Sequence, residues 1–412
     1  RRFGGSRLAL EAANLRVFTR NALGPRRSLA YHSVQALGSG TQFVAARISG
    51  NQDDAAYWKT WLKANLGLTP LPFVGHLADG ENDDPGVGSD APPDCPAVSV
   101  VVPTRGRADR LVRLVEALEA QTIPKDRFEV VIVDDASPDH TAEVLESIAD
   151  QTPLRLSVMH QSERRGPAAA RNVAWRSAHA PIVAFTDDDC VPDPDWLRAG
   201  LEAMDGNRRV VVGRTTPPPD QIHLAQDPFS RVMSVDSSRF FETCNVFYRR
   251  VDLAAVGGFD ERFRQPSGED THLGLAVTES GIEAVFAPDA LVLHDVRPGS
   301  LGDTLRETLR WKDLPLVLSG RRHARPGRAH RLLFWKPTHP SAILAGAGLL
   351  VALRHRGGLL LVLPWVRHRL FVTPTCPDPV RRVTTLPGAL AVDLCEVAVM
   401  VQGSIHHKTL LL

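Results

Sequence analysis

The sequence is poor in the features that mark several large classes of protein. Only five of its 412 residues are cysteine, and no two of them form a CxxC pair, which argues against a disulfide framework and against a zinc knuckle. Aromatic residues make up 6% of the chain, and 48 basic residues nearly balance 47 acidic ones. Without a charge excess or basic–aromatic interleaving, no nucleic-acid partner is expected.

Between about residues 97 and 190, the sequence alternates apolar runs with helical patterns. Apolar, strand-like runs span 98–102, 128–133, 154–159 and 180–184. Amphipathic helical spacing fills the intervals between them. This alternation predicts an α/β fold: a doubly wound, mostly parallel sheet with right-handed crossovers and with helices on both faces.

Acidic residues follow two of the predicted strands. Asp134-Asp135 comes after the run 128–133, and the triplet Asp187-Asp188-Asp189 comes just after the run 180–184. Adjacent carboxylates repel one another, so a protein tolerates them where water solvates them or a cation neutralises them. Ligands of such sheets bind beyond the carboxyl ends of the strands. The triplet therefore predicts a metal–diphosphate site, with a solvated acidic turn as the alternative.

Six ordered motifs between about residues 97 and 315 resemble those of the family 2 glycosyltransferases, which have a GT-A fold. The motifs read VSVVVPTRGR, VVIVDDASPDHT, RRGPAAARN, VAFTDDDCVPDPDWL, NVFYRRVDLAAVGGFDERF and GEDTHLGLAV. The resemblance implies an enzyme that transfers a hexosyl or deoxyhexosyl group from a nucleotide diphosphate sugar to an acceptor hydroxyl, usually with inversion. It also implies help from a divalent metal, Mn²⁺ or Mg²⁺.

The resemblance further implies roles for individual residues. Asp270, next to Glu269 in the catalytic motif, is the implied base that takes the proton of the acceptor hydroxyl. The nucleotide-sugar pocket is implied to contain Pro103, Thr104, Arg105, Asp134, Asp135, Ser137, Gly166, Arg171, Asp187 and Asp188. The implied metal ligands are Asp187, Asp189 and His294. The implied acceptor side consists of Gly258, Phe259, Asp260 and Trp311.

Three of these residues also have a purely structural interpretation. Asp270 precedes a helical pattern over 272–280, where the helix dipole favours a carboxylate as a cap. His294 ends the apolar run 290–293 and could be an ordinary strand-end histidine, and Trp311 could be a core residue. The sequence leaves both interpretations open for each of them.

The motifs also depart from the common family pattern. Arg105-Gly106 stands where many members have Tyr-Asn, and only Arg310-Trp311 is present of the Gln-x-x-Arg-Trp motif of the processive synthases. We therefore expect single additions rather than polymerisation.

Two other functions are alternatives to a glycosyltransferase. The first is a nucleotidyltransferase, which would need a Gly-rich phosphate loop, and residues 103–107 are a poor substitute for one. The second is an inactive membrane-associated scaffold of the same fold, which the intact acidic triplet and the Glu269-Asp270 pair disfavour.

Composition divides the chain into a catalytic domain and three further parts. We expect an N-terminal accessory region over 1–78, a flexible acidic linker rich in Gly and Pro over 79–96, the catalytic domain over 97–315, and a basic and apolar helical region over 316–412.

The last region contains a basic cluster between residues 321 and 331, followed by apolar runs at 342–353 and 359–366 that Arg354-His355-Arg356 separates. Each run is shorter than the ~20 residues that a membrane-spanning helix needs. We expect the two runs to lie in the interface of an anionic membrane, with a soluble helical subdomain as the alternative. This places the enzyme in the cytoplasm, peripheral on the inner face of the cell membrane, with a glycan or lipid-linked acceptor.

Overall fold

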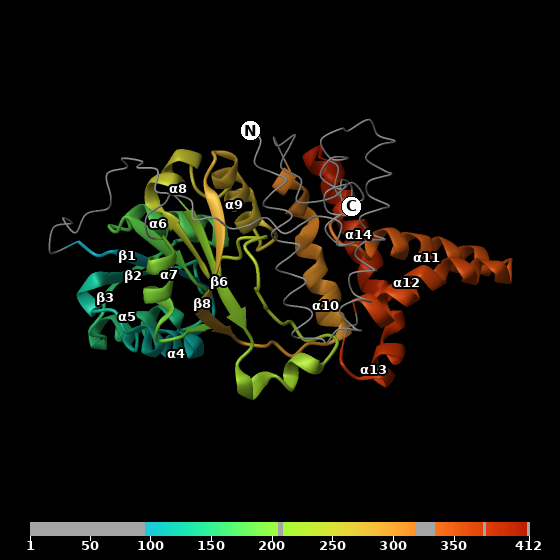
Figure 1. The fold of residues 1–412 in the computed structure, drawn as a ribbon, viewed down its shortest axis with the longest axis horizontal. Helices are drawn as coiled ribbons and strands as arrows, with labels where there is room; N and C mark the ends of the chain where they lie inside the picture. Colours follow the sequence, from blue (N-terminus) through green and yellow to red (C-terminus); the bar gives the residue numbers. More distant parts are fainter. Residues whose placement is uncertain (1–94, 205–208, 319–333, 374–375, 410–412) are drawn as a thin grey trace, which may run out of the picture. The chain divides into compact units, whose positions relative to one another are not determined.

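The computed structural model describes residues 95–204, 209–318, 334–373 and 376–409, which belong to one compact unit (Figure 1). The predicted accessory region 1–78, nearly all of the predicted linker and the basic cluster between residues 321 and 331 lie outside the described residues. All five cysteines are free thiols, as expected from their number and spacing.

The first half of the sheet is parallel. Its strands lie in the order β3-β2-β1-β4, and they are β1 (Val98–Thr104), β2 (Phe128–Asp134), β3 (Arg155–His160) and β4 (Ile182–Phe185). The crossover helices are α4 (Ala108–Glu119), α5 (Thr141–Gln151) and α6 (Pro167–Ser177). The β-branched strands β1 and β2 are buried almost throughout, as interior parallel strands are. The chain reverses its direction across the sheet after β3, so right-handed crossovers place α6 on the face opposite to α4 and α5.

The second half of the sheet mixes orientations. It adds β7 (Val246–Arg249), β6 (Arg209–Thr216), β8 (Glu283–His294) and β5 (Cys190–Pro192) in that order next to β4. The pairs β4–β7, β6–β7 and β5–β8 are antiparallel, whereas β6–β8 is parallel. Four of the seven pairings are therefore parallel, which confirms the predicted mostly parallel α/β sheet.

Short helices surround this sheet and continue beyond it. They are η1 (Lys125–Arg127), α7 (Trp196–Met204), η2 (Pro219–Gln221), η3 (Leu224–Gln226), α8 (Arg250–Val256), α9 (Glu269–Glu279), α10 (Leu301–Thr308) and η4 (Leu309–Leu318). Helix α9 begins three residues before the expected pattern at 272–280, with Gly268 as its N-cap at φ +107°. Asp270 consequently lies within the first turn of this helix and does not cap it.

The C-terminal region is helical, as predicted. It contains α11 (His339–Ala352), η6 (Arg356–Val362), α12 (Leu363–Arg367), the π-helical turn η7 (His368–Val372), α13 (Pro379–Thr384) and α14 (Leu386–His407). Helix α14 packs along η4 and α10. It is the one helix among the described residues that is long and apolar enough to cross a membrane, but 56% of its apolar window is buried inside the protein. It therefore packs one of its sides against the body of the protein.

Candidate active site

Two adjacent pockets lie at the carboxyl ends of the parallel strands. The triplet pocket, of about 270 Å³, is lined by Pro103, Thr104, Arg105, Arg107, Asp135, Arg164, Gly166, Pro167, Arg171, Asp187, Asp188, Asp189, Arg231, Pro266, His294 and Arg297. The Asp270 pocket, of about 260 Å³, shares Arg171, Asp187, Arg231 and Pro266 with it. Most of the residues that the sequence assigned to nucleotide and metal thus line one cavity, and Asp270 lines the next.

Asp134 and Ser137, in contrast, hold the first loop and are not among the lining residues. Asp134 accepts hydrogen bonds from the backbone N–H of Ser137 at 3.0 Å and from its hydroxyl. The Ser137 hydroxyl oxygen in turn accepts from the N–H of Gly106 at 2.8 Å. This chain of contacts joins the end of β2 to the loop after β1, so both residues act on the pocket through the loop.

Asp135 and Arg171 tie the segments of the site together. The carboxylate of Asp135 accepts from the N–H groups of Arg165 at 2.7 Å and Gly166 at 2.9 Å, which anchors the turn before α6. Gly166 has φ +92°, and a Cβ there would lie 2.6 Å from the carbonyl oxygen of Arg264. The buried guanidinium of Arg171 donates to Asp187 at 2.7 Å and to Glu269 at 3.0 Å. One arginine therefore links the acidic triplet to the motif that contains Asp270.

The middle carboxylate of the triplet is a buried link to the first loop. Asp188 accepts from the hydroxyl of Thr104 at 2.7 Å and from the guanidinium of Arg107. Burial raises the pKa of Asp188 to about 6, although the charge of Arg107 acts in the opposite direction. Its oxygens are occupied by protein groups, which fits a role in ordering the loop over β1.

The last carboxylate of the triplet lies among several cationic groups. The Oδ2 atom of Asp189 is 3.1 Å from Arg107 and 3.3 Å from Arg110, and it also contacts Arg297. Burial alone would raise the pKa of Asp189, but His294, Arg107 and Arg297 lower it to about 2. Sequence reasoning missed all three arginines. Arg107, Arg110 and Arg113 recur every three residues at the start of α4, and this spacing was the available signal for the first two but not for Arg297.

The geometry around Asp189 fits a divalent metal ion. His294 donates its Nδ1–H to the carbonyl oxygen of Asp295 at 3.0 Å, so in the neutral ring the lone pair of Nε2 faces Asp189 Oδ1 at 3.4 Å. Two facing acceptors repel each other unless a proton or a cation lies between them. A hydrogen bond from the other ring nitrogen to a backbone carbonyl, like that of His294 to Asp295, commonly orients a metal-ligating histidine. Cys190 lies nearby, but burial raises the pKa of its thiol well above the usual value. The oxygen and nitrogen donors of Asp189 and His294 suit Mn²⁺ or Mg²⁺ better than that sulfur does.

The Asp270 pocket contains the two acids of α9, Glu269 and Asp270, which have different hydrogen-bond partners. Glu269 accepts from Arg171 and from the N–H of Ser267 at 2.9 Å, so its oxygens are engaged. Asp270 accepts from the N–H of Thr271 at 2.6 Å. Burial raises the pKa of Asp270 well above its usual value, and repulsion from Glu269 and Glu242 adds to the effect. Of the two carboxylates, Asp270 is the one prepared to accept a proton.

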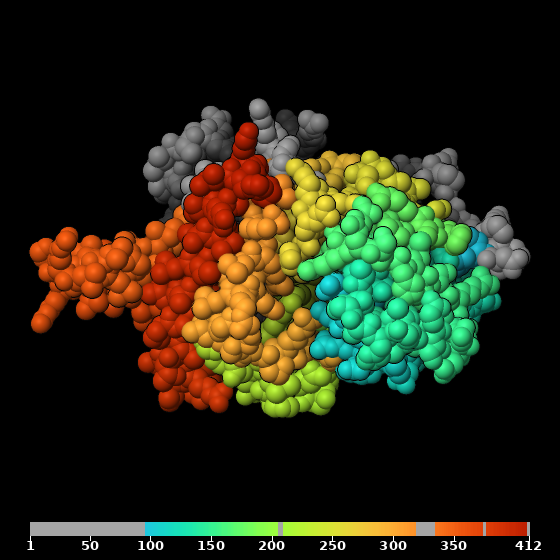
Figure 2. Space-filling model, turned by 180° about the vertical axis from the view of Figure 1, so that it is seen from behind, coloured from blue at the N-terminus to red at the C-terminus, as the bar shows by residue number. Residues whose placement is uncertain are grey.

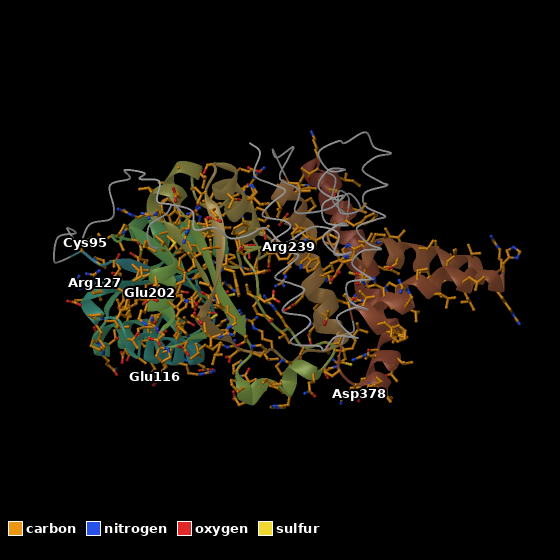
Figure 3. The ribbon with its side chains drawn as sticks, viewed as in Figure 1. Cys95, Glu116, Arg127, Glu202, Arg239 and Asp378 are labelled. Atoms are coloured by element: carbon orange, nitrogen blue, oxygen red, sulfur yellow. The ribbon has the colours of Figure 1, made fainter. Side chains whose placement is uncertain are left out.

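Aromatic side chains form the opposite wall of the Asp270 pocket. Trp335 packs on Phe240 with ring centroids 5.6 Å apart, and Lys336 lies 4.5 Å from the ring centroid of Trp311. The guanidinium carbon of Arg239, a residue labelled in Figure 3, lies 5.1 Å from the ring centroid of Phe240. Trp311 is therefore a wall residue. Sequence reasoning missed Phe240 and Trp335, because neither belongs to a motif with a recognisable spacing.

The other residues expected on the acceptor side line neither pocket. A Cβ at Gly258 would lie 2.5 Å from the side-chain oxygen of Asn172. Phe259 is buried edge-on against Phe185 at 5.3 Å. The carboxylate of Asp260 pairs with Arg262 at 2.6 Å. In the described structure these three residues pack the turn after α8, and the assignment to the acceptor side stays a prediction for them.

Comparison with known proteins gives a consistent result. A model described as glycosyl transferase family 2 matches residues 99–249. The chain is 30% identical over 222 residues to glycosyltransferase AglE of Haloferax volcanii, which covers 52% of this chain and 71% of AglE. It is 32% identical over 223 residues to validoxylamine A glucosyltransferase of Streptomyces hygroscopicus subsp. jinggangensis, covering 45% and 52% of the two chains.

Two further matches are a relative and a solved structure, which differ in extent. The chain is 30% identical over 236 residues to pre-mycofactocin glycosyltransferase of Mycobacterium tuberculosis, covering 52% of this chain and 46% of that protein. The chain thus spans about half the length of this relative and of the validoxylamine A enzyme. Among solved structures, the mannosyltransferase PcManGT from Pyrobaculum calidifontis, in complex with GDP-Man and Mn²⁺, is 22% identical. That match covers 79% of this chain and 91% of PcManGT with a TM-score of 0.47.

Proposed function

Because this chain belongs to glycosyl transferase family 2, we propose that it transfers a sugar from a nucleotide diphosphate sugar to an acceptor hydroxyl with inversion at the anomeric carbon. The membership confirms the prediction of a family 2 glycosyltransferase. The main support for the proposed reaction is the pair of adjacent pockets, one lined by the acidic triplet and one lined by Asp270.

The triplet pocket is the proposed donor site. Its lining includes the guanidinium groups of Arg105, Arg107 and Arg171, which are suited to the oxygens of a diphosphate or to stacking on a base. Asp135 and Asp187 offer acceptors for hydroxyl or N–H groups of a nucleoside. Asp134, Ser137 and Asp188 would support this site by fixing the loop after β1.

Asp189 and His294, with Asp187 in the same pocket, are the proposed metal-holding residues. A bound divalent ion would supply positive charge that offsets the charge developing on the departing diphosphate. The arginines around Asp189 would contribute to the same electrostatic task from the protein itself, since guanidinium groups bind phosphate oxygens strongly.

Asp270 is the proposed general base. Inversion in a single displacement needs a base on the side opposite to the leaving group, and Asp270 lies in the neighbouring pocket rather than in the triplet pocket. Its raised pKa makes it a better proton acceptor than an exposed aspartate at neutral pH. Arg171 would hold the neighbouring Glu269 in place through its hydrogen bond, so that the two acids have separate tasks.

We propose a glycan or a lipid-linked glycan as the acceptor. The supporting observation is the wall formed by Phe240, Trp311 and Trp335, since aromatic faces suit the apolar faces of sugar rings. We also propose that the protein acts in the cytoplasm, peripherally on the inner face of the cell membrane. The intact triplet and the perturbed Asp270 favour this enzyme over an inactive scaffold.

A thermal-shift screen with nucleotide diphosphates, each with and without Mn²⁺ or Mg²⁺, tests the donor site. A ligand that binds only the native state stabilises it by about 2.7 kcal/mol at a hundredfold excess over Kd. We expect a metal-dependent shift with one nucleotide, lost in Asp189→Asn and kept in Asp126→Asn. Asp126 is an exposed control on η1, at the opposite ends of the strands. The absence of a shift with every nucleotide, on folded protein, would contradict the proposal.

A further inference from the structure

Two helical segments of the C-terminal region form a hairpin, which we call the arm (residues 339–367). Helix α11 runs outward and η6 with α12 returns beside it. The two segments touch through glycines: a Cβ at Gly348 would lie 2.7 Å from the carbonyl oxygen of Gly358, and a Cβ at Gly358 would lie 2.5 Å from that of Gly348. The arm projects beyond its neighbour α14, as Figure 1 and the space-filling view in Figure 2 show.

The arm buries small residues and exposes large apolar ones. On α11 the buried side consists of Ala342, Ala345 and Gly348. The exposed apolar side chains of the arm are Ile343, Leu344, Leu349, Leu350, Val351, Leu353, Leu359, Leu360, Leu361 and Leu363. Leu350, Leu353 and Leu360 are 71%, 81% and 67% exposed. Soluble surfaces rarely carry so many large apolar side chains side by side, so this surface is built to contact something apolar.

The charges of the arm identify that partner. Residues 339–367 contain three arginines, Arg354, Arg356 and Arg367, and no aspartate or glutamate. A second copy of the arm would bring like charges together and would offer them no carboxylate. An anionic lipid surface offers both an apolar layer for the leucines and phosphate groups for the arginines. Helix α11, with 14 residues, is too short to span a bilayer.

The base of the arm is fixed to the body of the protein. Glu396 of α14 accepts from Lys336 at 2.8 Å and lies 3.1 Å from His339 Nε2, just where α11 begins. Asp393 of the same helix accepts from the indole N–H of Trp365 at 2.7 Å and from Arg369. These buried contacts fix the base of the arm to α14, and a small apolar core around Trp365 is shared between the arm and α14.

The same base leads directly into the Asp270 pocket. Trp335, in the wall of that pocket, lies four residues before α11 begins, and Lys336 contacts both Trp311 and Glu396. The arm therefore connects its exposed apolar surface to the segment that forms one side of the proposed acceptor site.

We propose that the arm lies in the interface of an anionic bilayer, with its exposed leucines in the acyl layer and its arginines at the headgroups, and thereby presents the Asp270 pocket to a lipid-linked acceptor. This inference rests on the proposed function and names the surface that attaches the enzyme. The arrangement needs no spanning helix, and it assigns the attachment to residues 339–367 rather than to α14.

Co-sedimentation of the full chain with vesicles tests the proposal. The vesicles contain phosphatidylcholine alone or with phosphatidylglycerol, at low and at high salt. We expect binding to the anionic vesicles and at least a tenfold lower partition coefficient for the triple variant Leu350→Glu, Leu353→Glu, Leu360→Glu. Val251→Glu, at a 66% exposed position on α8, is the matched control and should bind like the parent chain. Arg354→Gln with Arg356→Gln should weaken binding mainly at low salt.

Several outcomes would overturn the proposal. Equal binding of the triple variant and the control would place the contact on another surface. No binding of the parent chain to anionic vesicles would refute the membrane contact. A dimer in sedimentation equilibrium that the triple variant loses would assign the arm to a second copy of this chain. The metal-dependent thermal shift with nucleotide is measured in parallel on every variant. A retained shift without vesicle binding would refute the arm alone, whereas a missing shift in the parent chain would refute the proposed function.

Discussion

Replacing Asp270 by asparagine should reduce activity and increase stability in the same protein. The substitution keeps the shape of the side chain, and the amide oxygen can still accept the hydrogen bond that Thr271 donates at 2.6 Å. It removes the negative charge that burial and the acids Glu269 and Glu242 make unfavourable. It also removes the group that we propose as the proton acceptor of the reaction.

The two effects have magnitudes that the site sets. Loss of a general base lowers turnover by roughly 10²- to 10⁴-fold, which corresponds to about 3 to 5 kcal/mol in the activation free energy. A carboxyl whose pKa is raised on folding loses about 1.4 kcal/mol of native stability per pKa unit at pH values above the raised pKa. The stability gain of Asp270→Asn should therefore be complete at pH values above the raised pKa of Asp270 and should vanish at pH values below the ordinary aspartate pKa.

Chemical denaturation between pH 4 and 8 measures the change in stability, and initial rates of sugar transfer with a saturating donor measure the change in turnover. The rate of the parent enzyme should fall with decreasing pH at a pH well above 4, because protonated Asp270 cannot act as a base. Asp126→Asn is the control and should leave both profiles unchanged. Unchanged transfer in Asp270→Asn would refute the assignment of the base. A reduced rate accompanied by lower stability would show a defect of folding instead.

Two further substitutions test the attachment of the C-terminal helices. In a denaturation assay, Gly403→Ala should destabilise the protein by roughly 1–3 kcal/mol. The reason is that a Cβ at Gly403 would lie 1.9 Å from the carbonyl oxygen of Lys312, where α14 crosses η4. The control Gly357→Ala, with open space around it, should have little effect. Glu396→Gln should lower the melting temperature at pH 7 and flatten its decline in acid. Burial would raise the pKa of Glu396, but contacts with His339 and Lys336 lower it overall, so its stabilisation is present above the ordinary glutamate pKa and is lost as the pH falls through the lowered value. An unchanged acid profile in Glu396→Gln would contradict this account of the base of the arm.

The first four strands were predictable from their local composition, and all of them except β3 are largely buried. The β-branched runs at 98–102 and 128–133 pair in the interior of the sheet, and their composition alone indicates it. Strand β6 contains the buried β-branched run 210–212, a signal that sequence reasoning did not use. Strands β7 and β5 have only four and three residues. Their pairing depends on β4 and β8, so their existence follows from the sheet rather than from their own sequence.

The sequence by itself determined the parallel half of the sheet, the acidic residues at the strand ends and the family resemblance, because these features depend on neighbours within about ten residues along the chain. The tertiary structure decided what surrounds these residues. It placed Arg297 against Asp189 and Trp335 in the same pocket as Asp270, and it turned Asp134 and Ser137 toward the loop. Such contacts join residues far apart in the sequence, and only the packing of the whole sheet brings them within a few ångströms.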